Sequence, residues 1–141
     1  MPRSRTSSPS LTQEQKDALV DAHFQSEIAG DIDAIVDGFV PGAEHDVAGP
    51  PSGPVHGGEA IAAFYRGLLS GLRLGRFETM RRRYGDNHLV DDSILHATAV
   101  GGPADGRQVA VRILHVFDFS DGLISRENAW LDTAALQEQL A

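Results

Sequence analysis

Apolar side chains recur every three or four positions in three stretches of the first half of the chain, which is the period of an amphipathic α-helix. The stretches also carry boundary residues typical of helices, among them a capping box at Thr12 and Gln15. The three expected helices run from Thr12 to Gly30, from the N-cap Asp31 through Phe39 to a stop at Pro41 and Gly42, and from Glu59 to Leu72.

Further along the chain, apolar and polar residues alternate strictly, which is the period of a β-strand with one buried face. A short strand is expected at 43–47, before a loop rich in proline and glycine. Further strands are expected at 77–84, 88–91 and 93–100 and in a long hairpin over 107–132, with turns at 85–87 and at Asp91–Asp92 and a short helix over 133–140.

The hairpin over 107–132 contains a histidine that packing alone does not explain. Apolar residues fill the inner positions of its first strand, except that His115 stands where the period predicts another apolar side chain. Residues 120–122 supply the turn. A three-residue turn pairs His115 with Glu127, and a two-residue turn pairs it with Asn128. In either register a titratable ring faces a polar partner on an apolar surface, which is typical of functional sites.

Helices followed by a run of antiparallel strands are typical of an α+β fold, in which three N-terminal helices pack on one face of a curved antiparallel sheet. Such a sheet encloses a cone-shaped pocket. The length of 141 residues predicts a single domain, over 11–141. The polar, proline- and serine-rich residues 1–10 predict a flexible arm.

Composition narrows the classes of function. A net charge of -8 argues against a nucleic-acid partner, since binding phosphates takes a basic face. The absence of cysteine excludes disulfides, thiol nucleophiles and thiolate metal sites. No run of apolar residues is long enough to span a membrane, and the first ten residues lack the apolar core of a signal peptide. We therefore expect a cytoplasmic protein without a membrane partner.

Three of the six histidines are candidates for chemistry. His23 lies beside the apolar stripe of the first helix, four residues before Glu27, and His45 faces inward on the short strand at 43–47. With His115 they come from three different elements and face one cavity. Imidazole near its ordinary pKa is a competent base at neutral pH and also a hydrogen-bond donor.

Four stretches, in order, resemble the NTF2-like superfamily and most closely its SnoaL-like members: AGDIDAIVDGF, GGEAIAAFY, LHVFDFSDGLISRENAWLD and AALQEQL. The resemblance covers about 11–141. It implies a cone-shaped α+β fold and chemistry that needs no cofactor. It does not select one activity, because this superfamily includes isomerases, cyclases, epoxide hydrolases and binding proteins.

Ketosteroid isomerase shares this fold and allows a comparison by position. The resemblance places His23 at its oxyanion-binding tyrosine and His115 at its oxyanion-binding carboxylic acid. Its general-base aspartate falls at Val47, and a one-residue shift would place Asp46 there instead. His45 faces the cavity two residues earlier and could replace that base.

SnoaL-like cyclases and limonene epoxide hydrolase give a second comparison. His115 matches the cyclase histidine. The acid that both kinds of enzyme carry on the last strand falls at or near Ala129, which cannot transfer a proton. Glu127 lies on the same face two residues earlier and is the available substitute.

Three functions follow from these residues. The chain binds a hydrophobic carbonyl compound of polyketide or steroid type, or it isomerises or cyclises such a compound, or it is a non-catalytic homodimer that uses an outer face with Arg112 and Trp130. In the enzyme, His45 is the base, His23 and His115 polarise the carbonyl oxygen, and Glu127 orients His115. The expected ligand-binding residues are Phe24, Val47, Phe64, Tyr65, Tyr84, Ile113, Phe117, Ala129 and Trp130.

Three converging imidazoles are also the ligands of a catalytic zinc. However, His23, His45 and His115 lack the close spacing that metal-binding histidines usually show. We therefore expect a site without metal or other cofactor. The second register of the hairpin would place Trp130 in the pocket wall instead of on the outer face.

Overall fold

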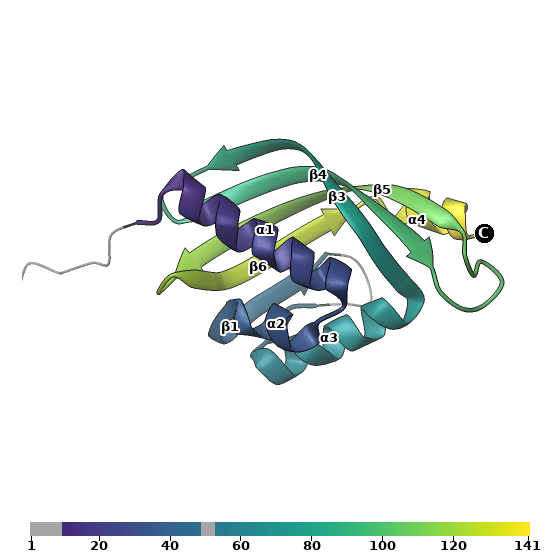
Figure 1. The fold of residues 1–141 in the computed structure, drawn as a ribbon, viewed down its shortest axis with the longest axis horizontal. Coiled ribbons are helices and arrows are strands. Elements are labelled where there is room, and N and C mark those ends of the chain that lie inside the picture. Colours follow the sequence, from purple (N-terminus) through teal and green to yellow (C-terminus); the bar gives the residue numbers. More distant parts are fainter. Residues whose placement is uncertain (1–9, 49–52) are drawn as a thin grey trace, which may run out of the picture.

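The computed structural model describes residues 10–48 and 53–141, so the expected arm over 1–10 lies outside the described residues except for Ser10. Figure 1 shows a long helix, α1, lying across a strongly curved sheet, with α2 and α3 beside it. The elements in chain order are α1 (Gln13–Ala29), α2 (Ile32–Asp37), β1 (Phe39–Val47), β2 (Val55–His56), α3 (Gly58–Gly71), β3 (Leu72–Tyr84), β4 (His88–Ala99), β5 (Gln108–Ser120), β6 (Leu123–Leu131) and α4 (Thr133–Leu140). This confirms an α+β fold with a short C-terminal helix.

The helices begin where the sequence predicts. The Thr12 hydroxyl accepts from the Gln15 amide at 3.1 Å, and the Gln15 side chain accepts from the Thr12 amide at 2.9 Å, so the capping box of α1 is confirmed. Asp31 caps α2 by accepting from the Ala34 amide at 3.1 Å. No helix in the described part of the chain is long and apolar enough to cross a membrane.

The expectation of three helices packed directly on the sheet is only partly right. The helix α2 has six residues and packs between α1 and α3. It stops at Asp37, so the prediction that it continues through Phe39 is wrong. Phe39 instead begins β1, where it pairs with Ile124. An apolar residue at helical spacing can serve a strand equally well, because both elements bury it.

The sheet has six strands in the order β2-β1-β6-β5-β4-β3. The strand β1 runs parallel to β6, while every other neighbouring pair is antiparallel. The sheet is therefore mixed, and the prediction of a wholly antiparallel sheet is wrong in this pair. The parallel pairing brings the first strand of the sheet beside the last one, far along the chain.

The strand β4 is continuous over 88–99, so the turn expected at Asp91–Asp92 is wrong. Asp91 is fully buried on the inner face, although aspartate is rare inside strands. The Arg82 Nε donates to Asp91 at 2.8 Å and the Thr79 hydroxyl donates to it at 3.0 Å. These donors replace the water that the carboxylate loses on burial. A buried aspartate can therefore be part of the continuous strand β4.

The hairpin register differs from both alternatives open from the sequence. Its turn has two residues, Asp121 and Gly122, with positive φ of 52° and 75°. A bulge on β6 then leaves Ser125 without a partner on β5, between Ile124 and Arg126. The pairing beyond the bulge shifts by one, so His115 lies opposite Ala129 rather than Glu127 or Asn128.

Arg82 joins α1 to the sheet, because its guanidinium also bonds to Asp17 at 2.9 Å and to Asp21 at 2.6 Å. We expect Arg82→Ala to lower the free energy of unfolding by about 3 kcal/mol, since it leaves the buried Asp91 carboxylate without its cation. Urea unfolding checks this. Arg81→Ala removes an exposed arginine from the same strand and should change stability by about 0.5 kcal/mol or less. Equal losses in the two variants would contradict the role given to Arg82.

Candidate functional site

Three histidines from distant parts of the chain meet inside the curve of the sheet. His23 comes from the middle of α1, His45 from β1 and His115 from β5, and each is at most 4% exposed. The inward orientation expected for His45 is therefore correct. Asp46, the alternative on that strand, points away from this group and accepts a hydrogen bond from the Asn128 amide at 3.3 Å.

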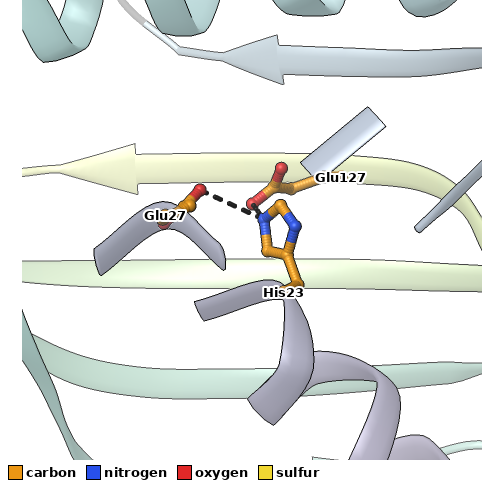
Figure 2. A group of neighbouring side chains, drawn as sticks. All are labelled: His23, Glu27 and Glu127. Atoms are coloured by element: carbon orange, nitrogen blue, oxygen red, sulfur yellow. Dashed lines mark hydrogen bonds and ion pairs between the residues drawn. The ribbon is translucent and has the colours of Figure 1, made fainter. Parts of the chain in front are cut away.

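Glu127 of β6 is the carboxylate around which the cluster is built. One of its oxygens lies 3.1 Å from His23 Nε2, and the other lies 3.0 Å from His45 Nε2. Both contacts are hydrogen-bond distances, and all three side chains are almost completely buried. Glu127 therefore holds one histidine from a helix and one from a neighbouring strand. Figure 2 shows the His23 part of this arrangement.

Two further groups, Glu27 and Tyr65, complete the cluster, in a role that the sequence pattern does not predict. Glu27, one helical turn after His23, lies 3.1 Å from His23 Nε2. The Tyr65 hydroxyl of α3 contacts both carboxylates, at 2.5 Å to Glu27 and 3.1 Å to Glu127. The spacing of four between His23 and Glu27 was the available signal. For Tyr65, which was expected only to line the pocket, the sequence gives no such signal.

His115 lies beside this network rather than within it. Its Nε2 is 3.8 Å from the nearest Glu127 oxygen, beyond hydrogen-bond distance. Its ring stacks on Phe117, with centroids 5.5 Å apart and planes 13° apart. Burial lowers the pKa of His115, so the ring is neutral at pH 7. Glu127 therefore orients His23 and His45, and the expectation that it orients His115 by a hydrogen bond is wrong.

The remaining pKa shifts follow from burial and from the two carboxylates. Burial acts to lower the pKa of His23, but the charges of Glu127 and Glu27 outweigh it and raise that pKa to about 10. Burial acts to raise the pKa of Glu127, but the charge of His23 and the neighbouring His45 side chain hold it well below its ordinary value. Burial and the same carboxylates raise the pKa of Tyr65. At neutral pH the cluster therefore contains a charged His23, an ionised Glu127 and a protonated Tyr65.

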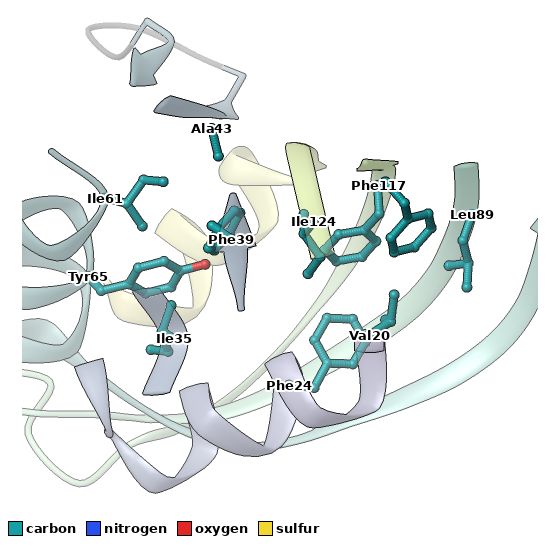
Figure 3. Close-up of a cluster of buried hydrophobic side chains, with 11 residues drawn as sticks. Val20, Phe24, Ile35, Phe39, Ala43, Ile61, Tyr65, Leu89, Phe117 and Ile124 are labelled. Atoms are coloured by element: carbon teal, nitrogen blue, oxygen red, sulfur yellow. The ribbon is translucent and has the colours of Figure 1, made fainter. Parts of the chain in front are cut away.

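Apolar side chains surround the polar cluster. Figure 3 shows Phe24, Tyr65 and Phe117 in the core against which it lies. The Phe24 ring is 5.1 Å from the His115 ring, and the Phe64 ring is 4.5 Å from the His45 ring. Ile113, Ala129 and the half-buried Val47 belong to a second apolar group at the other end of the sheet. These side chains fill much of the cone that was expected to be open.

Two residues expected to bind ligand lie elsewhere. Trp130 sits on the outer face of β6, 47% exposed and paired with Leu114, so it cannot form part of the inner wall. The register in which His115 lies opposite Ala129 places Trp130 on this outer face. Tyr84 is half-buried near the end of β3 and donates its hydroxyl to Asp17 at 2.7 Å.

Of the three histidines considered in the sequence, the group of described residues that could hold a metal ion includes His23 but neither His45 nor His115. One donor atom from each of His23, Glu27 and Glu127 lies within 4.8 Å of the others. The same atoms are already hydrogen-bond partners in the cluster. The arrangement is therefore complete as an acid–base group, in which an ionised carboxylate stands beside a protonated imidazole and a phenol.

The sequence matches the SnoaL-like domain over residues 20–127, more than half of the chain. No curated protein matches it significantly. The chain therefore belongs to the SnoaL-like family, and the resemblance seen in the sequence is confirmed.

Solved structures of known fold agree with this assignment. A candidate polyketide cyclase from Xanthomonas campestris is 20% identical with a TM-score of 0.77, over 92% of this chain and 98% of that one. An epoxide hydrolase from M. tuberculosis is 15% identical with a TM-score of 0.71, over 90% of both chains. An NTF2-like protein from Burkholderia xenovorans is 14% identical with a TM-score of 0.73, over 92% and 98%. At these identities the similarity establishes the NTF2-like fold alone.

The raised pKa of His23 predicts how stability depends on pH. Its protonated form stabilises the fold fully below about pH 6.5, and this contribution is lost as the pH rises toward about 10. We expect the free energy of unfolding to fall between pH 7 and pH 9.5, by up to about 1.4 kcal/mol per pH unit. Urea titrations at a series of pH values measure this slope.

The exposed His56 provides the control, because its replacement removes an imidazole outside the cluster. The variant His56→Gln should keep the slope of the wild type, whereas His23→Gln should flatten it. A slope that is the same in all three proteins would show that His23 is not protonated in the folded state.

Proposed function

We propose that this chain binds a small, mostly apolar carbonyl compound and transfers a proton to or from it without a cofactor. The observation that carries this proposal is the buried set of two carboxylates, two histidines and one phenol. Burying charged groups costs several kcal/mol unless they are paired, and such groups concentrate at functional sites. A fold that needed only a core could place apolar residues at these positions.

Each member of the cluster has a role in this proposal. One of the two carboxylates of the cluster, Glu27 or Glu127, takes the proton from the carbon beside the carbonyl group. Protonated His23 and the Tyr65 hydroxyl donate hydrogen bonds to the oxygen on which negative charge develops. His45 lies 3.0 Å from Glu127 and either orients that carboxylate or accepts the proton itself. His115 and the neighbouring phenylalanines bound the apolar part of the ligand.

The test is exchange of the α-hydrogens of cyclic ketones in D₂O, followed by proton NMR. We expect the wild-type protein to accelerate exchange of at least one ketone in a panel of one- and two-ring compounds. Tyr65→Phe should slow that exchange by about 100-fold, the typical effect of removing one donor to an oxyanion. A ketone that binds without exchanging would support the non-catalytic alternative.

Thr79→Val is the matched control, since it also removes a hydroxyl that donates to a buried carboxylate, Asp91, outside the cluster. Its exchange rate should equal that of the wild type. An equal loss of activity in Tyr65→Phe and Thr79→Val would count against a specific role of the cluster.

We also propose that the chain forms a homodimer through the outer face of the sheet. Trp130 and Leu114 are directly paired on this face and are 47% and 38% exposed. Two residues before Trp130 on the same strand, Asn128 is buried and its side-chain oxygen has no partner within the described residues. Large exposed apolar side chains beside an unsatisfied polar atom favour a protein partner. A cytoplasmic location remains a prediction.

Sedimentation velocity at micromolar concentration tests the dimer. We expect the wild type to sediment as a dimer and Trp130→Glu as a monomer, because a buried unpaired charge is strongly unfavourable in an interface. Met80→Glu introduces the same charge at an exposed residue of β3 and should leave the dimer intact. A monomeric wild type would refute this assembly.

A further inference from the structure

A hollow at the C-terminal end of α1 is lined in part by Glu27, one residue of the polar cluster. It has a volume of about 260 Å³ and lies between the end of α1, the end of α3 and the beginning of β3. Apolar side chains provide most of its wall, namely Ile28, Leu69, Leu72, Leu74 and Val100, and Arg73 adds one charged side chain. The residue of the cluster that lines it is Glu27, whereas His23, His45, Tyr65 and Glu127 do not.

The two carboxylates of the cluster therefore differ in access. Glu127 is enclosed by His23, His45 and Tyr65, which occupy both of its oxygens. The Glu27 carboxylate contacts His23 and Tyr65, and Glu27 is also one of the residues that line the hollow. A ligand in the hollow would meet Glu27 first. It would reach the His23 and Tyr65 donors only past this carboxylate, and Glu127 only by displacing side chains of the core.

We propose that this hollow is the ligand-binding site and that Glu27 is the catalytic residue that exchanges the proton with the ligand. This rests on the proposed function and assigns it to one carboxylate. The C–H bond beside the carbonyl breaks, its proton moves to a Glu27 oxygen, and the electron pair moves to the carbonyl oxygen as an enolate. The reverse step returns a proton or a deuteron to carbon. Glu127 is then a positioning residue, which fixes His23 and His45 behind Glu27.

The hollow also narrows the class of ligand. Its volume is just below the lower end of the range of about 300–1,000 Å³ that is common for drug-sized ligands. Among the lining side chains, only Glu27 and the exposed Arg73 can form hydrogen bonds. The ligand is therefore a mostly apolar compound of one or two rings, with a carbonyl group at the end that faces Glu27. Larger polycyclic ketones exceed this space.

Chemical rescue distinguishes the two carboxylates. In Glu27→Ala, ketone exchange should fall by at least about 100-fold, the usual minimum for loss of a general base. Added formate should restore much of this rate, because a small carboxylate can occupy the hollow. In Glu127→Ala, formate should restore nothing, since that position is closed. Rescue of Glu127→Ala but not of Glu27→Ala would overturn the assignment.

A larger side chain that fills the hollow gives a second test, and this substitution does not alter the cluster. Val100 is 40% exposed at the rim, so Val100→Trp should fill the opening without disturbing the core. Naphthol, a neutral compound of two rings, serves as the probe of the hollow. We expect Val100→Trp to weaken naphthol binding, measured by calorimetry, and to slow ketone exchange, each by tenfold or more. Met80→Trp places the same side chain at an exposed site outside the hollow and should behave as the wild type.

The outcomes separate the site from the function. Naphthol binding that Val100→Trp leaves unchanged would refute the hollow as the ligand site, whatever the exchange rates are. If the wild type exchanges no ketone, the proposed chemistry fails, and the calorimetric comparison still decides whether the hollow binds the ligand. If Glu27→Ala does not fold, the comparison of Val100→Trp with Met80→Trp decides alone.

Discussion

The carboxylate of Glu127, buried between two histidines and a tyrosine, is the interaction on which the inner part of this molecule depends. An ionised carboxylate loses its hydration inside a protein, and only charged or strongly polar partners replace it. Here those partners come from α1, β1 and α3. The Glu127 carboxylate therefore fixes the position of α1 on the sheet and the position of α3, and it sets the charge of the cluster.

This cluster is not an efficient way to stabilise a fold. Replacing a buried ionic group by apolar residues of similar volume is often neutral or stabilising. The Nδ1 atoms of His23, His45 and His115 also lack partners within the described residues, which adds an unfavourable desolvation. A stability optimum would not retain these groups, which supports the proposed chemistry. Asp91 differs from these histidines, because both of its carboxylate oxygens accept hydrogen bonds.

Much of the fold could be predicted from local patterns, because capping residues and apolar periods act over a few positions. The three histidines were found for the same reason, since each interrupts an apolar face. The errors arose where a distant interaction overrode the local signal. Asp91 is typical of a turn, but in the structure Arg82 bonds to it and it lies within a strand. Phe39 fits the helical period of the preceding segment, but it pairs with Ile124 in the sheet. The bulge on β6 leaves no mark in the sequence, and together with the two-residue turn it decides which residue lies opposite His115.

The parallel pairing of β1 with β6 has a consequence for how the protein folds. It joins residues near position 45 to residues near position 127, and the ion pair between His23 and Glu127 spans 104 positions. Contacts of such long sequence separation form late, because a long loop must close before they contribute. During synthesis α1 emerges with His23 and Glu27 well before Glu127 exists. Until the last strand leaves the ribosome, β1 has only the two-residue strand β2 beside it, and its histidine lacks the Glu127 carboxylate. The N-terminal half therefore completes folding only after almost the whole chain has been made.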